Sequence, residues 1–116
     1  MGWTLFYKGT LKDENDPSDV FGVVAGIAEE EQWGYEIDGD TMIVEFPVGY
    51  AEDLGFDLRS RSMDSWCKFF FEEEEEILAV FGLFYAIMPF FADYQIDDEY
   101  EAWIGFLAWK EGEQEV

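Results

Sequence analysis

Acidic side chains are the most abundant groups in this sequence that could carry chemistry. Asp38 and Asp40 flank a glycine, and Asp97 and Asp98 are adjacent. Carboxylate oxygens at such spacings can bind Mg²⁺ or Ca²⁺, and paired carboxylates can act as acid and base in a hydrolase. The same residues are also typical of a tight turn and of a helix cap. These four residues are therefore candidate metal ligands, with a purely structural role as the alternative.

Other catalytic chemistry is restricted by what the sequence lacks. It contains no histidine, which removes the commonest general base and every Ser-His or Cys-His pair. The single cysteine, Cys67, cannot build a zinc or iron–sulfur site alone, and no phosphate-binding glycine motif occurs. We expect no cofactor and lean towards a protein that is not an enzyme. Cys67 follows Trp66 and precedes Lys68, which could activate the thiol, but a buried core cysteine is the alternative.

The charge is the strongest deviation from an ordinary composition. Six Lys and Arg residues stand against 28 Asp and Glu residues, so the net charge is −22. Such a chain does not bind nucleic acid through its phosphates, and anionic membrane surfaces repel it. We expect a basic protein surface or a cation as partner. The alternatives are an inhibitor that mimics nucleic acid, and charge that serves only solubility or adaptation to salt.

An acidic run leads directly into the most apolar stretch of the chain. Five glutamates, Glu72, Glu73, Glu74, Glu75 and Glu76, precede the sixteen uncharged residues 77–92. That stretch is shorter than the roughly 20 residues of a membrane span, and a proline interrupts it. Its period predicts a helix with one bulky face and one stripe of small residues: Ala79, Gly82 and Ala86. The glutamates and this stripe are candidate contacts for a partner or a second copy.

The remaining pattern predicts an α+β fold. We expect the order β-α-β-β-β-β-α-(β)-α, with a mostly antiparallel sheet of four to six strands and two or three helices on one face. A helix beginning after Asp16 should end near Trp33 with Gly34 as its cap, and a last helix should run from Asp97 to Gly112. Residues 1–112 form a single predicted domain, and 113–116 a frayed acidic tail.

The outer face of the predicted sheet combines aromatic and basic residues. Arg59, Lys68 and Trp66 fall on it by alternation. Cross-strand ion pairs would explain this face, and a protein-binding surface is the alternative. The first ten residues lack the basic and apolar regions of a signal peptide, and a single cysteine suits a reducing compartment. We therefore expect a cytoplasmic protein-interaction domain that is not an enzyme, and either a monomer or a homodimer.

Overall fold

The computed structural model describes residues 2–47, 51–70 and 73–114. Within these ranges the chain forms six strands, three α-helices and one 3₁₀ turn, in the predicted order. The elements are β1 (Trp3–Leu11), α1 (Pro17–Glu31), β2 (Gly34–Asp38), β3 (Thr41–Glu45), β4 (Leu54–Asp57), β5 (Ser62–Phe69), α2 (Glu74–Ile87), η1 (Met88–Phe90), β6 (Phe91–Asp98) and α3 (Ala102–Gln114). The α+β class is confirmed.

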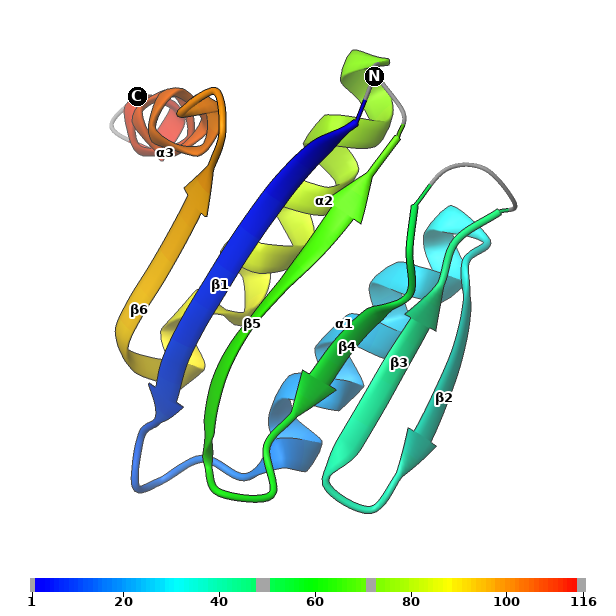
Figure 1. Ribbon diagram of the computed structural model, residues 1–116. Coiled ribbons are helices and arrows are strands. Elements are labelled where there is room, and N and C mark those ends of the chain that lie inside the picture. The colour runs from blue at the N-terminus through cyan, green and yellow to red at the C-terminus, as the bar shows by residue number, and fades with distance from the viewer. Residues whose placement is uncertain (1, 48–50, 71–72, 115–116) are drawn as a thin grey trace.

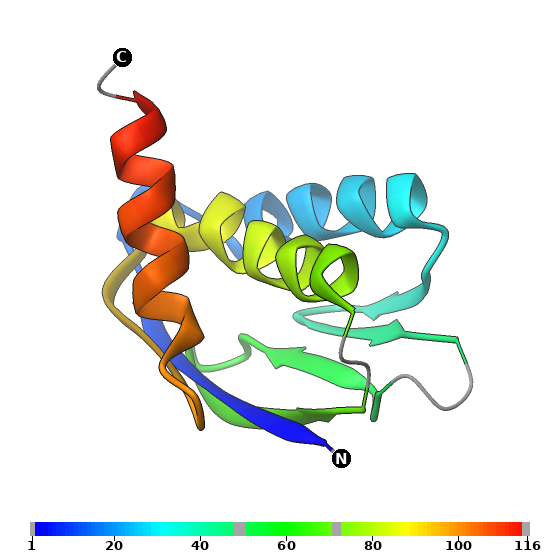
Figure 2. The same ribbon diagram turned by 90° about the horizontal axis from the view of Figure 1, so that it is seen from above.

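The strands lie in one curved layer that is divided into two sheets. β5-β1-β6 and β2-β3-β4 are each antiparallel and three-stranded across the described residues. The helices α1 and α2 lie side by side on one face of this layer, and α3 crosses beside β6 (Figures 1 and 2). The expectation of one sheet of four to six strands was therefore wrong. The two sheets meet where β4 runs next to β5, with an isolated bridge between Ala51 and Phe69.

The division lies at the short connection between β4 and β5. Leu58 is buried there, and its N–H donates to the carbonyl of Asp40 in the neighbouring hairpin. Arg61 adopts a positive φ of 68° and donates its N–H to the carbonyl of Leu58. After this turn β5 runs between β4 and β1, and it pairs with β1. Among the described residues, backbone hydrogen bonds do not join β4 to β5 as one sheet. A side chain links the two sheets instead, because the Tyr7 hydroxyl on β1 donates to the carbonyl of Gly55 on β4.

Aromatic rings form the core that holds the two sheets to the helices. Phe84 of α2 lies with its ring centroid 5.1 Å from that of Tyr7 on β1 and 6.0 Å from that of Phe56 on β4. Tyr7 and Phe56 are themselves 5.7 Å apart. All three side chains are at most 1% exposed. One helical residue therefore packs on both sheets at once.

The ends of two helices differ from the predicted ones. α1 starts at Pro17 as expected and ends at Glu31. Gln32, with a φ of 64°, is its cap and takes the left-handed position predicted for Gly34. Gly34 instead opens β2. α3 continues past Gly112, which we expected to end it.

The apolar stretch after the glutamates forms α2, then turns at Pro89 into η1 and β6. The break near this proline is as predicted. In the described part of the chain, no helix is long and apolar enough to cross a membrane.

Candidate functional site

An apolar groove lies between α2 and α3. One hollow of about 530 Å³ is lined mainly by apolar side chains of both helices, including Leu78, Phe106 and Trp109, with Glu74 at its edge. A second hollow of about 300 Å³ continues it towards the start of β1 and includes Tyr100. Both hollows are lined by the same three residues, Ile77, Phe81 and Ala102. We call the two together the α2–α3 groove.

The floor of the groove is fixed by aromatic rings that pack edge to face and at tilted angles. Phe81 is 2% exposed, with its ring 5.7 Å from that of Trp103 and 5.5 Å from that of Phe106. The Trp109 ring lies 5.8 Å from Phe106 and is 52% exposed. Rigid rings at the floor and half-exposed rings at the edge are typical of protein-binding surfaces.

The position of α3 depends on Asp98. This side chain is 9% exposed, and its Oδ2 accepts hydrogen bonds from the backbone N–H groups of Tyr100 and Ala102, at 3.2 and 3.0 Å. Its Oδ1 accepts from the N–H of Trp103 at 3.0 Å. These donors belong to the start of α3, where a helix has no internal acceptors for them. Asp98 therefore caps α3, and the prediction that Asp97 would do so was wrong.

Glu74 lines the α2 end of the groove, and other exposed carboxylates adjoin it along the chain. Glu73, Glu74 and Glu75 are exposed, and Glu101 is exposed immediately before α3. Glu72 lies outside the described residues. The nearest basic side chain on α3, Lys110, has its Nζ 5.3 Å from the ring centroid of Trp109. The groove thus offers apolar surface beside clustered negative charge.

Glu76 is less exposed than Glu73, Glu74 and Glu75. One of its carboxyl oxygens is buried and has no hydrogen-bond partner within the described ranges. Burial raises the pKa of Glu76, and the negative charges of Glu73 and Glu75, together with a hydrogen bond to Glu73, raise it further. A carboxyl with a raised pKa in the folded state is destabilising when it is ionised. The unfavourable contribution is present above that pKa and disappears as the pH falls towards the unfolded value.

Replacing Glu76 with glutamine should therefore raise the Tm at pH 7. The gain should shrink as the pH is lowered and vanish near pH 4, at about the ordinary pKa of glutamate. Melting curves of both proteins between these pH values measure it. Glu75→Gln is the matched control, because Glu75 also lies in the first turn of α2 but is exposed. A Tm for Glu76→Gln at or below that of the unmodified protein at pH 7 would contradict the assignment.

The predicted small-residue stripe is only partly covered. Ala79, Gly82 and Ala86 are all half-buried, and Ala79 packs against the core. A side chain added at Gly82 would meet no atom within 4 Å. The stripe is thus partly exposed to solvent, and no other helix packs closely against Gly82 in the described part of the chain.

The candidate metal ligands are not gathered into one site. Asp38 and Asp40 flank Gly39, whose φ of 60° makes the turn between β2 and β3. Asp97 is exposed on β6, while Asp98 points inward to cap α3. In the ranges that the structure describes, no three His, Cys, Asp or Glu residues are placed to hold a metal ion.

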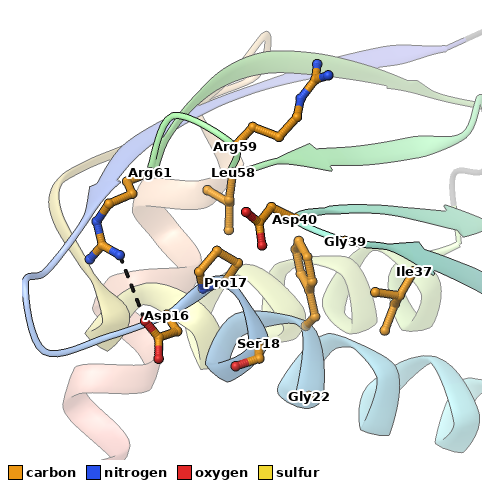
Figure 3. Close-up of a pocket in the computed structure, with 11 residues that line it drawn as sticks. Asp16, Pro17, Ser18, Gly22, Ile37, Gly39, Asp40, Leu58, Arg59 and Arg61 are labelled. Carbon is orange, nitrogen blue, oxygen red and sulfur yellow. Dashed lines mark ion pairs between the residues drawn. The ribbon is translucent and has the colours of Figure 1, made fainter.

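A third hollow, of about 670 Å³, opens between the start of α1 and the β2–β3 turn (Figure 3). Two arginines line it, but both make contacts within the chain. Arg59 extends away from the hollow and forms an ion pair with Asp57, at 2.6 Å between Nη2 and Oδ2. Arg61 donates to the carbonyls of Lys12 and Asn15. The contacts of both arginines are structural.

The sheet face predicted to carry aromatic residues does so. Trp66 is 55% exposed, and Lys68 is half-buried with its Nζ 5.7 Å from the ring centroid of Phe70. Cys67 between them points inward and is buried. Burial, helped by the charges of Glu52 and Asp53, raises the pKa of the Cys67 thiol to about 12. The core interpretation of this cysteine is therefore correct, and activation by Lys68 is not.

No protein-family model, curated protein or solved structure matches this chain.

Sequence reasoning found the glutamates at one end of the groove but missed the groove itself. The available signal was in α3. Apart from the inward-facing Trp103 and Phe106, the α3 segment and the residues just before it carry exposed Tyr100, Ile104 and Trp109. A helix with large apolar residues outside its buried stripe indicates a second contact surface.

Proposed function

We propose that this protein is an interaction domain, not an enzyme, and that its α2–α3 groove binds a basic amphipathic segment of another protein. The observation that carries the proposal is an apolar groove with Phe81 at its floor and Glu74, one of a run of glutamates, at its edge. An amphipathic helix can place apolar side chains in such a groove while its Lys or Arg residues meet the carboxylates. With a net charge of −22, the protein would also attract a basic partner from a distance.

The cytoplasm is the compartment that we propose. Its support is the single cysteine, which is buried and held as a thiol of raised pKa. A carboxylate-based metal binder or hydrolase has less support, because the four candidate aspartates are divided between a turn, an exposed strand position and a helix cap. A mimic of nucleic acid is the other function considered from the sequence.

A panel of synthetic peptides tests the proposal. The first is a helical peptide of about five turns with leucines on one face and lysines on the other. We expect it to bind by calorimetry with a Kd in the micromolar range, and to bind at least about tenfold more weakly when the salt is raised from about 0.05 to 0.5 M.

Two control peptides separate the contributions. One has the same composition with the leucines distributed around the helix, and the other carries glutamate in place of lysine. We expect the first control to bind at least about tenfold more weakly and the second not to bind. Equal affinity for the amphipathic and the redistributed peptide would reduce the interaction to unspecific charge attraction and overturn the proposal.

A further inference from the structure

A second exposed apolar surface lies on the opposite side of the strand layer. Trp66 of β5 and Phe6 of β1 are directly opposed cross-strand partners and are 55% and 50% exposed. Phe70, just beyond the end of β5, is 43% exposed. Alternation places these rings on the outer face, away from α1 and α2, so no helix covers them (Figure 2).

This face is nearly balanced in charge, unlike the rest of the chain. The exposed or half-buried charged residues at its paired strand positions are Lys8, Asp64, Lys68 and Asp97. The charges at these paired positions sum to 2 − 2 = 0, and exposed Asp93 in the bulge of β6 brings the three strands to −1, against −22 for the whole protein. Two copies of so acidic a chain repel each other unless they meet where the charge is locally neutral and the surface is apolar. A basic partner, by contrast, would find little excess of acid here.

We propose that the outer face of β5-β1-β6 is the interface of a homodimer. The two sheets would pack face to face about a two-fold axis that runs along the row of Trp66 and Phe6. Each ring would then meet its counterpart. Asp64 and Lys68 lie two residues to either side of Trp66 on β5, so this axis brings Lys68 of one copy onto Asp64 of the other. Asp97 pairs with Phe6 on the same row, so the two Asp97 residues would face each other at the β6 edge, each with Lys8 as a diagonal neighbour.

The size of the face fits a weak but specific dimer. Three strands of this length cover about 30 by 15 Å, so a face-to-face pair would bury on the order of 1,000 Å² in total, the lower end of specific interfaces. The two α2–α3 grooves would remain open, because α2 and α3 do not lie on the outer face (Figure 2). The dimer rests on different residues from the proposed groove and does not depend on it.

Charge exchange between Asp64 and Lys68 tests the geometry. Sedimentation velocity over a range of protein concentrations should show a monomer–dimer equilibrium for the unmodified chain. Asp64→Lys and Lys68→Asp should each raise the dimer Kd at least about tenfold, because each places two like charges together across the axis. The double exchange should restore the Kd to within about threefold, because opposite charges meet again.

Trp66→Ser provides a test that does not change charge, with an expected increase in Kd of at least about tenfold. Circular dichroism and melting curves establish that each variant is folded. If Asp64→Lys fails to fold because it faces Lys8, Lys68→Asp and Trp66→Ser still decide the question. A chain that stays monomeric at about 1 mM in both 0.15 and about 0.5 M salt, or a dimer that none of these substitutions weakens, would overturn the proposal.

The dependence on salt concentration distinguishes the proposed dimer from the proposed peptide binding in the groove. Added salt should strengthen the dimer, because it screens the repulsion between two acidic copies, and should weaken the binding of a basic peptide. Failure of one proposal therefore leaves the other to be judged by its own result.

Discussion

Replacing Phe84 with alanine should lower the free energy of unfolding by about 3–5 kcal/mol, the range for removing a buried aromatic ring. Phe84 is fully buried and packs against Tyr7 in one sheet and Phe56 in the other. Its loss would therefore leave a cavity where the two sheets and α2 meet. Because domains have total stabilities of roughly 5–15 kcal/mol, much of the protein would be unfolded at moderate temperature. Urea unfolding followed by circular dichroism measures the change.

Tyr7→Phe is the matched control for Phe84→Ala. It removes only the hydroxyl that donates to the carbonyl of Gly55 and keeps the ring in place. We expect it to cost about 1 kcal/mol, the usual contribution of one hydrogen bond. If Phe84→Ala cost no more than Tyr7→Phe, the aromatic contacts would not be what holds the two sheets together.

Asp98→Ala should detach the start of α3, at a cost of about 1–3 kcal/mol. The substitution leaves three backbone N–H groups without their acceptor, including that of buried Trp103. Since α3 forms one wall of the groove, peptide affinity should fall as well. Hydrogen exchange should accelerate in α3 more than in α2, because the loss is local.

Asp97→Ala is the control, because Asp97 is the preceding residue and has the same charge but is exposed. We expect a change within about 0.5 kcal/mol. Asp98→Asn should lie between the two, because it keeps one acceptor oxygen. Equal effects at positions 97 and 98 would contradict the assignment of the cap to Asp98.

These two aspartates show what alternation can decide. Both are acidic and adjacent, and either could precede a helix. The choice depends on the phase of β6, in which Ile96 and Asp98 face inward and Asp97 faces outward. The predicted order includes this strand only as an optional element, so its phase was not established. The order of elements was correct because the helical and strand periods of the longer segments are regular.

The division into two sheets could not be predicted from the sequence, for a different reason. Alternation determines which side chains face the core, but not which strand edges pair. Here a turn in which Leu58 is buried and Arg61 takes a positive φ joins β4 to β5, yet β5 pairs with β1. Neither residue is a usual turn signal. The groove was equally hidden, because it arises from the way α3 packs on α2, and neither helix contains it alone.

The affinity of the amphipathic basic peptide for two double variants tests the central claim most directly. Leu78→Ser with Trp109→Ser removes exposed apolar surface from the groove, while Ile37→Ser with Ile43→Ser removes it from β2 and β3. We expect the first pair to raise the Kd at least about tenfold and the second to leave it within about twofold. Equal affinities for both pairs would contradict the groove as the binding site.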